Sequence, residues 1–71
     1  MRFLGFEHVG TTISLNNLAT LYQTMGRYVE AEPLYQRALA VREKTLGFEH
    51  VYTAISLDNL AVLYQAMGRN V

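Results

Sequence analysis

The sequence predicts an all-α fold in which antiparallel helix pairs stack as in an α-solenoid, with three successive helices. Residues 4–29 return as residues 46–71, 42 positions later, with 20 of 26 pairs identical. Apolar residues in each copy recur at steps of three and four, the period of a helix. A glycine follows each apolar segment, where helices commonly end. We therefore expect a single unit over residues 1–71, with one full repeat at about 11–52 and the first helix of a second repeat at 53–67.

The first helix is predicted at about residues 12–25, after an N-terminal loop segment over residues 1–10. Thr11 is the expected N-cap, because a hydroxyl just before an apolar periodic segment satisfies free backbone N–H groups. The apolar face of this helix is formed by residues spaced three and four apart: Leu15, Leu18, Ala19, Tyr22 and Met25. Gly26 then ends the helix.

The second helix is predicted at about residues 29–46. Pro33 is compatible with a first helical turn but clashes further along, so the helix is expected to begin late or to bend there. Gly47 ends it, residues 47–52 form a loop, and Thr53 caps the copy of the first helix. A solvated face is expected for the charged residues of the second helix: Arg37, Arg42, Glu43 and Lys44.

Stacking is predicted to bury the apolar stripes, because no single helix can bury its own. The very short link between the first two helices makes them antiparallel neighbours. Small residues let the backbones approach closely (Ala19, Ala31 and Ala38), and larger ones fill the space between them (Leu18, Tyr22 and Tyr35). Aromatic residues at helical spacing can also form a platform on which nucleic-acid bases stack (Tyr22, Tyr35 and Tyr64). Their place on the apolar stripes favours core packing instead.

These residues resemble the tetratricopeptide repeat family. The first helix has Leu15-x-x-Leu18-Ala19-x-x-Tyr22, the second has Ala31-x-x-x-Tyr35-x-x-Ala38, and the third repeats Leu57, Leu60, Ala61 and Tyr64. The 42-residue period is similar to that of the kinesin-light-chain type. The resemblance implies a scaffold that binds a peptide or protein along a groove lined by the first helix of each pair. Related loops carry His-Pro-Asp, where this chain has His8-Val9-Gly10 and His50-Val51-Tyr52.

Composition narrows the function. Six basic residues balance six acidic ones, so no excess positive charge favours nucleic acid. There are no cysteines, and no apolar run approaches the roughly 20 residues of a membrane span. Neither a catalytic constellation nor a phosphate-binding loop is recognisable. We therefore expect a cytoplasmic protein that is not an enzyme, needs no cofactor, and has no nucleic-acid or membrane partner.

His8 and His50 occupy the same loop position in the two copies. Paired histidines raise the question of a metal site. However, one repeat separates them and each has a single nearby carboxylate, Glu7 or Glu49, so four ligands cannot be assembled. Loop packing or helix capping is favoured, and no metal is predicted.

Four of the six substitutions between the copies fall at residues 12, 16, 20 and 24, a stripe on one side of the first helix. One interpretation is that this side is a groove whose chemistry was changed to suit a ligand. The other, which a single chain favours, is drift at exposed positions. Without Lys or Arg on these helices, no carboxylate clamp is expected. The predicted partner-binding residues are Asn16, Asn17, Thr20, Thr24, Asp58, Asn59 and Val62.

A repeat array needs about three repeats and polar ends, whereas this sequence holds one full repeat and the first helix of a second. We therefore expect Ile13, Leu21 and Leu63 to risk exposure and to support self-association, giving a homo-oligomer. The alternative function is thus a self-assembling structural element, or a piece of a longer array, that acts through its end-to-end packing faces.

Overall fold

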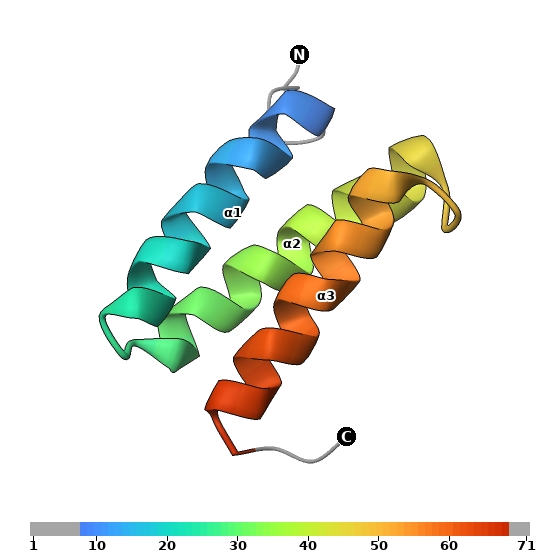
Figure 1. Cartoon of the computed structure of the whole chain (residues 1–71). Coiled ribbons are helices and arrows are strands. Elements are labelled where there is room, and N and C mark those ends of the chain that lie inside the picture. The colour runs from blue at the N-terminus through green and yellow to red at the C-terminus, as the bar shows by residue number, and fades with distance from the viewer. Residues whose placement is uncertain (1–7, 69–71) are drawn as a thin grey trace.

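The computed structural model describes residues 8–68, which form three α-helices and contain no strand. Helix α1 is Val9–Thr24, α2 is Tyr28–Leu46 and α3 is Val51–Ala66. Helix α2 runs antiparallel to both α1 and α3, and packs against both of them (Figure 1). The predicted all-α fold of antiparallel helix pairs is therefore confirmed.

Helix α1 begins three residues earlier than the sequence predicts. His8 is its N-cap and Nδ1 of its imidazole accepts from the Gly10 backbone N–H at 3.0 Å. Val9 and Gly10, placed in a loop by the sequence, thus belong to the helix, while residues 1–7 lie outside the described residues. Gly26 follows the helix with φ 80°, a left-handed conformation that only glycine adopts without strain.

The same N-terminal geometry recurs in α3, where His50 Nδ1 accepts from the Tyr52 N–H at 3.0 Å. The expectation that Thr11 and Thr53 cap these helices is wrong. Thr53 is fully buried, and its hydroxyl donates to the Gly47 carbonyl at 2.7 Å, tying α3 to the end of α2. The capping role favoured for the histidines is confirmed.

Helix α2 begins at Tyr28, directly after the turn, so the expectation of a late start is wrong. Its first helical bond runs from the Ala31 N–H to the Arg27 carbonyl at 3.1 Å. Pro33 lies inside the helix, one turn beyond Val29, whose carbonyl would face the missing proline N–H. The helix ends at Leu46, as predicted, with Gly47 at φ 88°.

The core lies between α2 and its two neighbours. Ala31 and Ala38 of α2 and Ala19 of α1 are fully buried, so the helix axes approach closely at these small residues. The buried cluster consists of Ala19, Ala31, Tyr35, Leu60 and Leu63. Partly buried side chains pack around it, namely Tyr22, Tyr28, Leu34, Leu39, Tyr64 and Met67. The tyrosines therefore serve core packing, as expected.

The two copies bury opposite sides of nearly the same helix. Helix α1 buries Thr12 and Ala19, whereas α3 buries Thr53, Ser56, Leu60 and Leu63. Leu18 is 41% exposed, although its copy Leu60 is only 8% exposed. The expectation that Leu18 fills the space between helices is wrong, because α2 reaches α1 and α3 from different sides.

Candidate protein-binding surface

A cavity of about 370 Å³ lies where the three helices face one another beside the α1–α2 turn. Its lining residues come from all three helices and are all uncharged: Thr20, Gln23, Thr24, Tyr28, Tyr35, Asn59, Val62 and Ala66. Hydrogen bonds and apolar contacts, rather than ion pairs, are therefore what this lining can offer a ligand.

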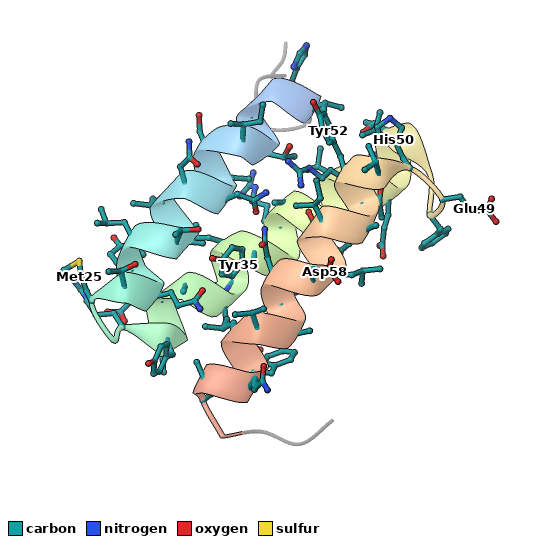
Figure 2. All side chains as sticks on the ribbon, viewed as in Figure 1. Met25, Tyr35, Glu49, His50, Tyr52 and Asp58 are labelled. Atoms are coloured by element: carbon teal, nitrogen blue, oxygen red, sulfur yellow. The ribbon has the colours of Figure 1, made fainter. Side chains whose placement is uncertain are left out.

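Tyr35 is the most buried residue of this lining, at 3% exposure, and lies between the ribbons of α1 and α3 (Figure 2). Its hydroxyl donates to Gln23 Oε1 at 2.9 Å. The Thr20 hydroxyl lies 2.9 Å from the Tyr35 hydroxyl oxygen. Thr20 must be the donor in this bond, because the phenolic hydrogen of Tyr35 is already used for Gln23. This network holds the Thr20 and Gln23 side chains in fixed positions at the wall of the cavity.

The cavity brings together four of the seven predicted partner-binding residues. Thr20 and Thr24 come from α1, and Asn59 and Val62 come from α3. Asn17 is exposed on α1 three residues before Thr20, on the same side of the helix. Asn17 itself does not line the cavity.

Asn16 and Asp58 lie elsewhere. Asn16 is half-buried against α2, and with its amide oxygen toward Arg42 that oxygen accepts from Nη2 at 3.2 Å and lies 3.0 Å from Nη1. Thr12, on the same stripe, is fully buried. Residues 12 and 16 are therefore covered on α1, whereas their copies Ala54 and Asp58 are exposed on α3. Asp58 is exposed on α3 and does not line the cavity.

Arg42 is buried, contrary to the solvated position that its charge predicts. Instead of lying on a solvated face, it is 4% exposed. Its Nε donates to Thr12 Oγ1 at 2.9 Å, and its Nη1 donates to Ser56 Oγ at 2.8 Å and to the Tyr52 carbonyl at 3.0 Å. The guanidinium carbon also lies 5.1 Å from the centre of the Tyr52 ring. One side chain of α2 thus ties α1 to α3.

Burial lowers the pKa of Arg42, and the nearby Tyr52 opposes that shift. The acceptors named above are neutral oxygens, so the charge is solvated by hydroxyl, carbonyl and amide dipoles. A sequence signal was available in retrospect: Thr12, Ser56 and Arg42 all fall at helix positions that face the neighbouring helix. Its charge nevertheless predicts an exposed side chain for Arg42, since arginine is seldom fully buried.

Arg27 and Glu30 form the exposed ion pair of the α1–α2 turn, with Nη2 and Oε2 2.8 Å apart. The hydrogen bond between them raises the pKa of Arg27 and lowers that of Glu30. The Arg27 guanidinium carbon also lies 5.0 Å from the centre of the Tyr22 ring. Because the pair is exposed, it orders the turn locally but adds little to stability.

The residues expected to support self-association divide into two groups. Ile13 is 49% exposed and Leu21 is 54% exposed, as anticipated. Leu63 is fully buried in the core, so its predicted exposure is wrong. Its copy Leu21 lies on what we call the outer face of α1, with Ser14, Leu18 and Met25, all exposed. Figure 2 shows Met25 pointing away from α2 and α3.

Other kinds of site find no support in residues 8–68. No three His, Cys, Asp or Glu residues of this part of the chain are grouped so as to hold a metal ion. Of the three helices, none has both the length and the apolar character needed to cross a bilayer.

Comparison with known proteins identifies the repeat. The family model for the tetratricopeptide repeat matches residues 10–70, nearly the whole chain. A search of curated proteins gave no match. The matched segment covers all of α2 and α3 and all but the first residue of α1. The three helices carry the pattern of small and aromatic residues described above. The chain therefore belongs to the tetratricopeptide repeat family, whose members are repeat modules for protein–protein interaction.

Proposed function

We propose that this chain binds an extended, uncharged stretch of a partner polypeptide in the cavity between α1 and α3. The observation that supports this most is the composition of the cavity wall, which joins fixed hydroxyl and amide groups to apolar ones. The amide group of Asn59 in this wall offers a donor and an acceptor, matching the peptide unit of an extended backbone. Asn17, outside the lining but on the same side of α1 as Thr20, offers the same groups to a longer segment. Val62 and Ala66 offer apolar contact to its side chains.

The charge distribution supports a neutral segment in preference to a terminal carboxylate. No lining residue carries a positive charge that would hold such a group. Selectivity would instead come from polar groups that must find partners when water is displaced, since unpaired buried polar groups are costly. In the cell, we expect the chain to act as a cytoplasmic scaffold rather than as an enzyme.

The test starts with peptides selected on the immobilised chain from a random displayed library. Their affinity is then measured by fluorescence anisotropy for the chain and two variants. Ala66→Trp fills the cavity, whereas Ala40→Trp adds the same side chain at an exposed position of α2 outside it. We expect Ala66→Trp to weaken binding by about tenfold or more and Ala40→Trp to leave it unchanged. Peptides that bind Ala66→Trp as tightly as the wild type would rule out the cavity.

A second candidate function is self-association through the outer face of α1, which Leu18, Leu21 and Met25 leave 41%, 54% and 55% exposed. Contiguous exposed apolar side chains commonly mark interaction surfaces. Sedimentation of the wild type across concentrations would reveal oligomers, and Leu21→Glu should dissociate them. A monomer at every concentration would exclude this candidate. Leu63→Glu is unsuitable as a test, because it places a charge in the core.

A further inference from the structure

The cavity beside the α1–α2 turn has two walls of opposite chemistry. On α1 its lining residues are all polar, namely Thr20, Gln23 and Thr24. On α3 the positions equivalent to the two threonines hold Val62 and Ala66, which line the same cavity. Two of the six substitutions between the copies thus meet across one cavity. A side chain that enters it has polar groups on one side and apolar groups on the other.

Hydrogen bonds within the α1 wall decide which of its atoms remain for a ligand. The Thr24 hydroxyl donates to the Thr20 carbonyl at 2.9 Å. The Thr20 hydroxyl donates to the Tyr35 hydroxyl, which in turn donates to Gln23 Oε1, each at 2.9 Å. Both threonine hydrogens are used in these bonds, so the two hydroxyls can offer a ligand only oxygen lone pairs.

The Gln23 amide is the hydrogen-bond donor of this wall. Its Oε1 is held by Tyr35, and within residues 8–68 no hydrogen bond uses its Nε2, which carries two hydrogens. Gln23 follows Thr20 by three residues and directly precedes Thr24, and all three line the cavity. The α1 wall therefore presents donor hydrogens and acceptor oxygens close together.

We propose that the α1 wall binds the carboxamide side chain of a glutamine or asparagine in the partner polypeptide, a specificity that rests on the proposed function because it requires a partner segment in the cavity. A carboxamide carries a carbonyl oxygen and an NH2 group on one edge. Its oxygen accepts from Gln23 Nε2 while its nitrogen donates to a threonine oxygen. Val62 and Ala66 on the facing wall contact the methylene groups of the same side chain.

Other ligand groups match only part of the α1 wall. A carboxylate has no hydrogen for the threonine oxygens, and an ammonium group has no acceptor for Gln23. An apolar side chain of equal size leaves these wall groups without partners once water is displaced, which is costly. In a trans peptide unit the C=O and the N–H point in opposite directions, so both cannot face one wall. The side-chain amide is therefore the group that pairs with both kinds of atom.

The probes are the peptides selected on the immobilised chain whose binding Ala66→Trp weakens. We expect these peptides to share a glutamine or asparagine at one position. Replacing that residue by the acid of the same shape, or by methionine or leucine, should weaken binding measured by fluorescence anisotropy by about tenfold or more. The control peptide keeps that residue and carries the same replacement at another position, and its affinity should change by less than about twofold.

Gln23→Glu and Gln65→Glu make the same change at equivalent positions of the two copies. Gln23→Glu keeps an oxygen for Tyr35 but replaces the donor nitrogen by an acceptor, so it should weaken peptide binding by about tenfold or more. Gln65 is exposed and does not line the cavity, so Gln65→Glu controls for the added charge and should leave the affinity unchanged. Circular dichroism checks that both variants fold, and the peptide replacements test the unaltered protein.

The results separate carboxamide recognition from peptide binding in the cavity. Peptides that Ala66→Trp displaces but that share no glutamine or asparagine, or that accept the acid or methionine without loss, would leave the cavity as the binding surface and overturn carboxamide recognition. Equal affinities for Gln23→Glu and Gln65→Glu would overturn it as well. If no selected peptide depended on the cavity, the proposed function and carboxamide recognition would both be refuted.

Discussion

Arg42 of α2 lies with its Nε 2.9 Å from the Thr12 hydroxyl of α1, in a position from which its Nη1 also reaches α3. Backbone-to-backbone hydrogen bonds do not join helices α1, α2 and α3 to one another, because the backbone groups of a helix bond within that helix. Apart from apolar contact, the hold of α2 on its neighbours therefore depends on side-chain bonds of this kind. The consequence is that one charged residue contributes to both helix interfaces.

Arg42→Ala should lower the free energy of unfolding by about 2–4 kcal/mol, because Thr12 and Ser56 lose a charged donor and a cavity replaces the side chain. Chemical unfolding followed by circular dichroism measures this loss. Arg37→Ala, at an exposed position of the same helix, is the control and should change stability by no more than about 0.5 kcal/mol. Equal losses from the two variants would contradict the bridging role of Arg42.

Leu63→Ala and Leu21→Ala remove the same atoms at equivalent positions of the two copies. Leu63 is fully buried, so its truncation should cost about 2–4 kcal/mol of stability. Leu21 is 54% exposed, so the same change should cost less than about 1 kcal/mol. Thermal unfolding of dilute protein is the measurement, since dilution removes any oligomer. Similar melting temperatures for the two variants would mean that α2 does not discriminate between these faces.

His50→Ala should destabilise the chain by about 1 kcal/mol, because the Tyr52 N–H at the start of α3 loses its acceptor. His50→Asn should recover most of this loss, since asparagine is among the best N-cap residues. Thermal unfolding of the three proteins tests the order. If alanine and asparagine behaved alike, the contribution of His50 would come from its ring contact with Tyr52, 5.3 Å between centroids, rather than from capping.

Thr20→Val introduces the residue that the second copy carries at position 62, and removes the hydroxyl that donates to Tyr35. Tyr35→Phe removes the other side of the same bond. Each change should cost about 0.5–1.5 kcal/mol, and the double variant should cost less than their sum. Urea unfolding provides the cycle. Strictly additive losses would show that the two hydroxyls act independently, and the cavity wall would then lack its proposed fixed geometry.

The amount of the structure that the sequence predicts follows from how local each feature is. Helix identity, the turn at Gly26 and the end of α2 at Gly47 depend on periodicity and on backbone freedom, which are properties of a few adjacent residues. The caps were misplaced because histidine is a less familiar cap than threonine, although Nδ1 of its imidazole can accept in the same way.

The sequence by itself determined that near copies of a helix flank an intervening helix, and that the chain is a tetratricopeptide repeat. It could not determine which side of each copy meets α2, because the two copies are almost identical and therefore carry almost the same apolar pattern. Only the tertiary structure decided that α2 covers Ala19 on one copy and Leu63 on the other. The physical reason is that a helix lying between two others contacts each from an opposite direction, so burial depends on position in the stack as well as on residue type.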